Sequence, residues 1–283
     1  MPLWLRQKVQ KVLRRLVQRL SKMDADAYLN RINYRGSLAP SAETLRQLQV
    51  AHLLAVPFEN LSIHSGQPIV LNDEALFNKI VTRRRGGFCY ELNGLFAAFL
   101  RALGFKVNML SAEVANREGS FGPDFAHMTL LVTLEERWLA DVGFGDSFNE
   151  PLLLDCRGAQ VQGERAYQIL PDGDHFILKQ RDNNGEWNTQ YRFTLQPYSY
   201  ADYVEMCHYH QTSPQSHFTQ GRICTRETPA GRITLSEMRF ITTGKDGERQ
   251  ERVLTKEEEY ASLLCEQFGI IEQLKFRSNS GSL

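Results

Sequence analysis

Three side chains of this 283-residue chain could cooperate in acyl transfer: the thiol of Cys89, the imidazole of His127 and the carboxylate of Asp141. A thiolate attacks a carbonyl carbon, a histidine removes the thiol proton, and a carboxylate holds the histidine in one tautomer. Each residue alone has an ordinary structural explanation, as a buried cysteine, a hydrogen-bonded histidine or a turn residue. Their order along the chain favours a nucleophile with its base and orienting acid.

Cys89 stands at the start of a predicted helix. Gly104 is a natural terminator of that helix, and its apolar residues recur at helical intervals, at Leu92, Leu95, Phe96, Phe99, Leu100 and Leu103. Unpaired N–H groups and the positive end of the helix dipole favour an anion at a helix start. We therefore expect the pKa of the Cys89 thiol to be lowered, which would make it more nucleophilic.

His127 and Asp141 are expected on neighbouring antiparallel strands. Residues 128–134 and 137–142 have strand character, and Glu135-Glu136 forms the turn between them. Pairing of these strands would bring His127 and Asp141 within a few residues of each other. The carboxylate could then hold the imidazole N–H.

The remaining pattern predicts helices first and short strands afterwards. Helices are expected over residues 24–32, 41–53 and 73–81, with Asp24 or Asp26 and Ser41 as N-caps. Strands are expected over 107–110, 128–134, 137–142, 166–170, 175–181 and 186–193, which is typical of an antiparallel sheet or barrel. The C-terminal part is expected to hold helices over 200–208 and 256–268 and strands over 221–225, 233–242 and 248–254.

Composition indicates an ordinary globular protein. Hydrophobic residues make up 42% and charged residues 23%, and no apolar run is long enough to span a membrane. The five cysteines show no Cys-x-x-Cys pair, which argues against disulfides and zinc and favours a cytoplasmic location. Residues 23–283 carry 26 basic and 33 acidic side chains, so nucleic acid is not an expected partner. Self-association is left open.

Residues 1–22 form a basic amphipathic extension, with seven basic side chains and no acidic one. Its apolar positions fall on one helical face and its charges on the other. Three interpretations compete: a helix docked on the protein or a partner, a membrane-surface anchor, and a dispensable extension upstream of Met23. We favour a docked or dispensable extension, because apolar helix faces are more often packed against protein than bound to lipid.

A metal site is not expected. His208 and His210 form a His-x-His pair, but no third ligand is suitably spaced around them. The nearby Cys207 has no partner cysteine in a Cys-x-x-Cys pattern.

The motifs around the three reactive residues resemble those of the arylamine N-acetyltransferases. The segments that carry this resemblance, besides His127, are 84–93 (RRGGFCYELN), 56–61 (VPFENL), 141–145 (DVGFG) and 213–218 (SPQSHF). The resemblance covers residues 23–270, while residues 1–22 and the short C-terminal region depart from the family pattern.

The resemblance implies an α+β fold of three parts with a papain-like Cys-His-Asp arrangement. The implied parts are a helical domain over 23–106, an antiparallel β-barrel domain over 107–198 and an α/β lid over 199–283, after the extension 1–22. Cys89 would come from the first part, and His127 and Asp141 from the second.

The resemblance also implies a ping-pong reaction. Cys89 would take the acetyl group from acetyl-CoA and pass it to an aromatic amine, a hydrazine or an N-hydroxyarylamine. Acetyl-CoA would be the co-substrate, and no metal would take part. Phe144, Phe218 and, less directly, Phe58 would line the acceptor pocket, which must be apolar to hold an aromatic ring.

Contacts to CoA are expected from the loop 143–147, through Gly143 and Gly145, and from Ser216 and His217. Asp146 stands where relatives often carry glycine, and an acidic residue there would oppose a pyrophosphate. Arg85 could contact CoA phosphates, but the resemblance favours a supporting pair between Arg85 and Glu59. Arg83 and Arg84 are then expected at the surface.

Other functions use the same residues. A cysteine peptidase or a transglutaminase-like enzyme shares the triad chemistry, and a macrocycle-forming amide synthase shares the fold. A non-catalytic binding protein that retains the fold is disfavoured by the intact Cys89, His127 and Asp141.

Overall fold

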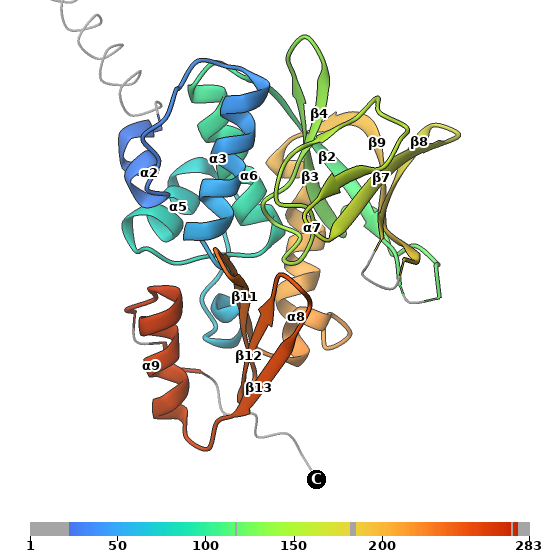
Figure 1. Cartoon of the computed structure of the whole chain (residues 1–283). Helices are drawn as coiled ribbons and strands as arrows, with labels where there is room; N and C mark the ends of the chain where they lie inside the picture. The colour runs from blue at the N-terminus through green and yellow to red at the C-terminus, as the bar shows by residue number, and fades with distance from the viewer. Residues whose placement is uncertain (1–22, 117, 182–184, 273, 277–283) are drawn as a thin grey trace, which may run out of the picture.

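The computed structural model describes residues 23–116, 118–181, 185–272 and 274–276. The basic extension 1–22 therefore lies outside the described residues. Within them, no helix is both long and apolar enough to cross a membrane. Figure 1 shows helices on one side, a curled sheet beside them, and a second sheet with its own helix below both.

The N-terminal part is helical, as predicted. The caps also agree: the Asp24 side chain accepts from the Ala27 N–H at 3.0 Å, and Ser41 accepts from Thr44 at 3.1 Å. The helical elements described before Cys89 are α2 (Ala25–Arg31), α3 (Ala42–Ala55), α4 (Leu61–His64), α5 (Asp73–Phe77) and a π-helical turn η1 (Asn78–Thr82).

The helix predicted from Cys89 is confirmed as α6 (Cys89–Ala102), and Gly104 follows it with a φ of +96°. Every residue from Cys89 to Leu100 is buried. A helix that is buried all round must be enclosed by other elements. Here α6 lies between the other N-terminal helices and the first strands of the curled sheet (Figure 1).

The predicted antiparallel barrel is confirmed. Its eight strands curl into a nearly closed barrel in the order β5-β4-β3-β2-β9-β8-β7-β6 (Figure 1). They are β2 (Lys106–Val114), β3 (His127–Thr133), β4 (Arg137–Ala140), β5 (Leu152–Leu153), β6 (Gln160–Gln162), β7 (Arg165–Asp172), β8 (His175–Arg181) and β9 (Trp187–Tyr198). The strand expected over 107–110 is longer, because β2 continues to Val114 beside both β3 and β9. The short strands β5 and β6 were not predicted from the sequence.

The C-terminal part adds two helices, four strands of a five-stranded sheet and a final helix. These are α7 (Tyr200–Thr212), α8 (His217–Gln220), β10 (Ile223–Thr228), β11 (Gly231–Ser236), β12 (Arg239–Gly244), β13 (Arg249–Val253) and α9 (Glu257–Phe268). The prediction of one strand over 233–242 is wrong, because the chain turns at Glu237, whose φ is +48°. Strands β11 and β12 therefore pair with each other as a hairpin.

The fifth strand of this sheet comes from the N-terminal part. Strand β1 (Phe58–Glu59) pairs with β10, so Phe58 lies opposite Thr225 and Glu59 opposite Cys224. The segment 56–61 is thereby joined to the C-terminal sheet. The sheet thus crosses the boundary expected between the first and last parts of the chain.

Candidate active site

His127 and Asp141 lie in direct contact. His127 begins β3, and Asp141 follows β4, whose last residue Ala140 pairs with Leu130. The imidazole Nε2 and the carboxylate Oδ2 are 2.6 Å apart, and both side chains are buried. A carboxylate at this distance accepts the Nε2–H, so Nδ1 is the nitrogen left free to accept a proton.

The carboxylate of Asp141 is surrounded by donors. Asn93 Nδ2 donates to Oδ1 at 2.8 Å, the Gly143 N–H donates at 2.9 Å, and the Tyr191 hydroxyl donates to Oδ2 at 3.1 Å. Burial is the largest influence on the pKa of Asp141 and raises it, but His127 and these hydrogen bonds together leave the pKa below its usual value. Asp141 is therefore held ionised beside His127.

Asn93 connects three elements at this point. Its Nδ2 also donates to the Met128 carbonyl at 2.6 Å, and its Oδ1 accepts from the Val142 N–H at 2.8 Å. Because Asn93 lies one turn after Cys89 on α6, it ties the cysteine helix to the residues that follow both His127 and Asp141. Sequence reasoning missed this role, although a polar residue on the buried face of an apolar helix was a signal.

Two further residues contact Asp141, and nothing in the sequence predicted these contacts. Gln49 on α3 accepts from the Asp141 N–H at 3.1 Å, and Tyr191 reaches it from β9. Both come from elements distant in sequence, so only the packing of α3 and the closure of the barrel bring them here.

The Cys89 thiol lies beside the His127 strand, and its pKa shifts opposite to the sequence prediction. Cys89 is 2% exposed, and this burial raises the pKa of the thiol well above its usual value. Hydrogen bonds from the backbone at Met128 and Tyr90 act in the other direction but do not outweigh burial. A helix start alone therefore does not ionise this thiol, and ionisation requires a base that takes its proton.

The loop after Asp141 packs directly on the cysteine. A Cβ added to Gly143 would lie 2.8 Å from the Cys89 Cα and 2.9 Å from its carbonyl oxygen. Only glycine permits this approach, because both neighbouring atoms belong to the backbone.

We expect Gly143→Ala to slow by about 100-fold a reaction in which Cys89 is the nucleophile, because the loop and the thiol must move apart. Steady-state kinetics measures this loss. The matched control is Gly122→Ala, whose added Cβ meets nothing closer than the Val114 carbonyl at 3.4 Å. Equal activity of the two variants would contradict the close-packing argument.

The three predicted aromatic residues fall into two groups. The Phe218 ring meets the Phe88 ring edge-on, with 5.4 Å between the ring centroids, and its centroid lies 6.2 Å from that of Phe58. The Phe144 ring instead meets the His127 ring edge-on, with 5.1 Å between the centroids. One group therefore lies beside the residue before Cys89, and the other lies against the imidazole.

Arg85 and Glu59 form a fully buried ion pair. The guanidinium Nη2 lies 2.8 Å from Glu59 Oε1, and both side chains are 0% exposed. A second pair lies alongside, with Lys79 Nζ 2.8 Å from Glu91, whose carboxylate also accepts from the Phe88 N–H at 3.1 Å. Arg85 Nη1 also lies 3.4 Å from the partly exposed Glu272, and together these charges hold the residues that lead into α6.

Removal of one partner from a buried pair leaves an uncompensated charge. We expect Arg85→Met to lower the free energy of unfolding by about 3 kcal/mol. The control is Arg84→Met, which removes an exposed arginine that forms no ion pair within the described residues. We expect that control to change stability by less than about 0.5 kcal/mol in urea unfolding. Similar losses in both variants would show that the buried pair is not what stabilises this segment.

The residues expected to contact CoA do not line one common cavity. Gly145 has a φ of +94°, and its carbonyl accepts from Arg232. Ser216 is buried and accepts from the Phe218 N–H at 3.3 Å, whereas His217 is exposed on α8. None of these three lines the larger cavity described next.

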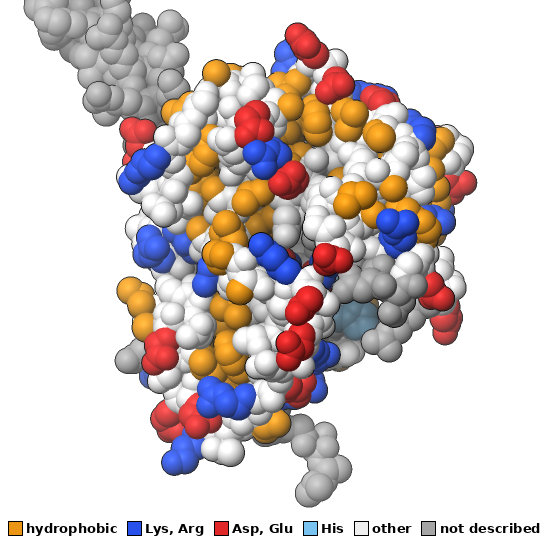
Figure 2. Space-filling model, viewed as in Figure 1, with side chains coloured by type: hydrophobic (Ala, Val, Ile, Leu, Met, Phe, Trp, Pro, Cys, Tyr) orange, Lys and Arg blue, Asp and Glu red, His pale blue; other side chains and the backbone are white. Residues whose placement is uncertain are grey.

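A cavity of about 580 Å³ lies between α3, the loop after Asp141 and the β10–β12 edge. Figure 2 shows a hollow on the visible face, with basic and acidic side chains at its rim. Its lining includes Ser147, Arg165, Arg232 and Lys245. Asp146 borders it, 2.5 Å from Arg165 and 3.4 Å from Arg232, and the neighbouring arginines hold the pKa of this carboxyl below its usual value. Its charge is thereby neutralised.

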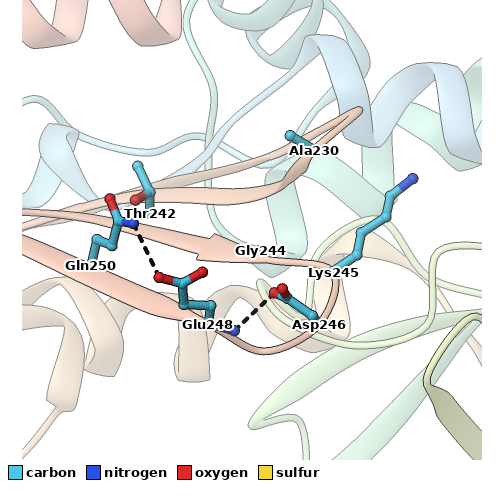
Figure 3. A pocket seen from close by; sticks show the side chains of 7 residues that line it. All are labelled: Ala230, Thr242, Gly244, Lys245, Asp246, Glu248 and Gln250. Atoms are coloured by element: carbon cyan, nitrogen blue, oxygen red, sulfur yellow. Dashed lines mark hydrogen bonds between the residues drawn. The ribbon is translucent and has the colours of Figure 1, made fainter.

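A second pocket of about 440 Å³ is lined by residues of the β12–β13 hairpin and its neighbours, including Lys245, Asp246 and Glu248 (Figure 3). It contains none of the predicted site residues. Among the described residues, no three His, Cys, Asp or Glu side chains converge as a metal site would require.

Comparison with known proteins identifies the class of this site. The family model described as N-acetyltransferase matches residues 41–276. The arylamine N-acetyltransferase of Escherichia coli strain K12 is 35% identical over 246 residues, which cover 86% of this chain and 87% of that protein. Proansamycin X synthase of Amycolatopsis mediterranei is 30% identical over 261 residues, with 87% and 96% coverage.

Solved structures agree. The arylamine N-acetyltransferase from Salmonella typhimurium has a TM-score of 0.83 and 34% identity, and covers 89% of this chain and 93% of its own. The enzyme of Mycobacterium marinum in complex with CoA has a TM-score of 0.80 and 33% identity, with 87% and 93% coverage. This chain belongs to the arylamine N-acetyltransferase family, which consists of acyltransferases.

Proposed function

We propose that this chain transfers the acetyl group of acetyl-CoA to aromatic amines, hydrazines or N-hydroxyarylamines through an acetyl-Cys89 intermediate. The observation that carries the proposal is the buried contact between His127 and Asp141 beside the start of the cysteine helix. His127 lies 2.6 Å from Asp141, and Cys89 accepts a hydrogen bond from Met128, the residue after His127. Asn93, on the helix that Cys89 begins, donates to the Asp141 carboxylate and to the Met128 carbonyl.

In the first half-reaction, His127 Nδ1 takes the thiol proton and the Cys89 sulphur attacks the thioester carbon. The tetrahedral intermediate collapses with cleavage of the bond to the CoA sulphur. His127 then returns the proton to that sulphur, and free CoA departs. The Cys89 N–H lies in the first turn of α6, where it has no intrahelical acceptor, so it can donate to the oxyanion.

In the second half-reaction, the amine nitrogen attacks the acetyl-cysteine carbonyl. His127 accepts the proton that the amine loses and returns it to the departing Cys89 sulphur. Aromatic amines are weak bases that stay unprotonated near neutral pH, so they attack without a strong base. Phe58, Phe144 and Phe218 supply the apolar surface for the acceptor ring, since these rings lie around Phe88 and His127.

For CoA, the supporting observations are the CoA complex of the Mycobacterium marinum relative and the cavity beside the loop 143–147. Gly143 and Gly145 remain proposed contacts in that loop. Arg165, Arg232 and Lys245 offer donors to phosphates from a lining that also contains Glu150, Glu164 and Glu227. Because Asp146 is paired with two arginines, it opposes an anion less than its sequence position suggests. Ser216 and His217 remain proposed contacts on α8.

Each of the three proposed parts of the chain has a separate role in the reaction. Residues 23–106 present the nucleophile, residues 107–198 present the base and acid, and residues 199–283 cover the acceptor side. A cytoplasmic location and acceptors of small size belong to the same proposal, and no metal takes part in it.

The second candidate is a macrocycle-forming amide synthase. It is favoured by one observation, the 30% identity to proansamycin X synthase over 96% of that protein. The two candidates differ in the acyl donor. A peptidase or transglutaminase would use an amide donor instead, and membership of this family favours a thioester.

Kinetics with two substrates tests the proposal. Acetyl-CoA and a simple aromatic amine are expected to give acetylated amine and free CoA, with parallel double-reciprocal plots. No product with any aromatic amine, together with rapid turnover of a carrier-bound polyketide thioester, would favour the amide synthase. Turnover of a peptide amide would favour the peptidase.

A further inference from the structure

The backbone of Phe218 is held by two side chains of the segment that follows the 56–61 motif. Asn60 Nδ2 donates to the Phe218 carbonyl at 2.9 Å, and His64 Nε2 donates to the same oxygen at 3.0 Å. Since Asn60 also donates to the Gly221 carbonyl at 2.7 Å, both of its N–H groups are used. The His64 N–H is therefore a second bond to the Phe218 carbonyl, beside that of Asn60, whose Nδ2 lies 3.3 Å from His64 Nε2.

The other side of the same residue is held from α7. The Phe218 N–H donates to Ser216 Oγ at 3.3 Å, and that oxygen lies 3.0 Å from His210 Nδ1. Since α8 is a helix of only four residues, it has little rigidity of its own. The position of Phe218 is therefore set by contacts from α4 and α7.

The held ring lies close to the nucleophile. Phe218 contacts Phe88, the residue before Cys89, edge-on at 5.4 Å, and contacts the His210 ring at 5.1 Å. A shift of the Phe218 backbone would move this ring relative to the acceptor space. Among the described residues, the hydrogen bonds of Asn60, His64 and Ser216 that hold Phe218 do not involve His127 or Asp141. Acceptor binding and the acylation chemistry can therefore be separated.

We propose that His64 is a positioning residue for the acceptor: through its hydrogen bond to the Phe218 carbonyl it sets the aromatic wall that receives the ring of an arylamine. This proposal rests on the proposed acetyl transfer and deepens it. Asn60 shares the role, but it also accepts from the Ile223 N–H at 2.8 Å, so its loss would disturb β10 as well. His64 is consequently the cleaner residue to change.

The test uses the two half-reactions separately on the full chain. Enzyme acetylated with acetyl-CoA is mixed with increasing aromatic amine, and the half-saturating amine concentration is measured. His64→Ala is expected to raise that concentration about fivefold, the effect of one hydrogen bond. The burst of CoA released in the first half-reaction is expected to stay at its wild-type rate, and hydrazine, which has no ring, is expected to react normally.

Three variants complete the test. His64→Gln keeps an N–H donor and should restore the wild-type value. In a Phe218→Ala background, His64→Ala should have no further effect, because the ring it positions is gone. His208→Ala removes an exposed histidine of α7 and should change nothing.

The outcomes separate the two proposals. Equal slowing of both half-reactions by His64→Ala, or an undiminished effect in the Phe218→Ala background, would overturn the positioning role. Absence of CoA release from the wild-type enzyme would instead refute acetyl transfer itself.

Discussion

Cys89→Ala is expected to abolish acetyl transfer to an aromatic amine while the protein remains folded. The rate should fall at least about 10⁴-fold, because no acyl-enzyme can form without the nucleophile. The fold should persist, since alanine fills most of the same buried space and the surrounding ion pairs do not involve the sulphur. Product formation, with near-ultraviolet circular dichroism as a measure of packing, checks both statements.

The matched control for this variant is Cys207→Ala. Cys207 on α7 is also 2% exposed and belongs to the same apolar core as Cys89. Its sulphur accepts a hydrogen bond from Gln211 at 3.4 Å, so its loss should leave most of the activity. If Cys89→Ala kept more than a few per cent of the wild-type rate, the covalent mechanism would be refuted.

Asp141→Asn is expected to lower activity by about 10³- to 10⁴-fold. An asparagine amide donates to His127 Nε2, so that nitrogen must carry a lone pair and the imidazole proton moves to Nδ1. Nδ1, the nitrogen that we propose takes the thiol proton, can then no longer accept it. Since the Cys89 pKa is raised by burial, the thiol stays protonated and unreactive. The rate of CoA release from acetyl-CoA measures this loss.

The effect of Asp141→Asn on the free energy of unfolding should also depend on pH. The pKa of Asp141 is below its usual value in the folded protein, so the carboxylate contributes stability above its unfolded pKa and loses it as pH falls through the folded value. The stability difference between wild type and Asp141→Asn should therefore shrink in urea unfolding between neutral pH and pH values below about 4. A difference that grew with acidity would contradict the ionised carboxylate.

The helix that carries Cys89 could be predicted because its apolar residues repeat at helical spacing and Gly104 ends it. The contact between His127 and Asp141 could be predicted because β3 and β4 are joined by a short turn, which leaves one pairing. Both arguments use residues near each other in sequence. The barrel could be predicted because several short strands are separated by turn residues.

What the sequence could not provide depends on long-range packing. Gln49 and Tyr191 reach Asp141 from α3 and β9, and β1 joins a sheet whose other strands begin more than a hundred residues later. The direction of the Cys89 pKa was wrong for the same reason. A helix start predicts an exposed anion, whereas the fold buries this thiol completely, and burial outweighs the helix end.

The most direct test of the account is the location of the acetyl group. Enzyme mixed with acetyl-CoA is quenched in acid, digested and analysed by mass spectrometry. We expect one acetyl group on the peptide that contains Cys89, its removal when an aromatic amine is added before the quench, and its absence from Cys89→Ala. Acetylated amine formed while Cys89 stays unmodified under all quench times would contradict it.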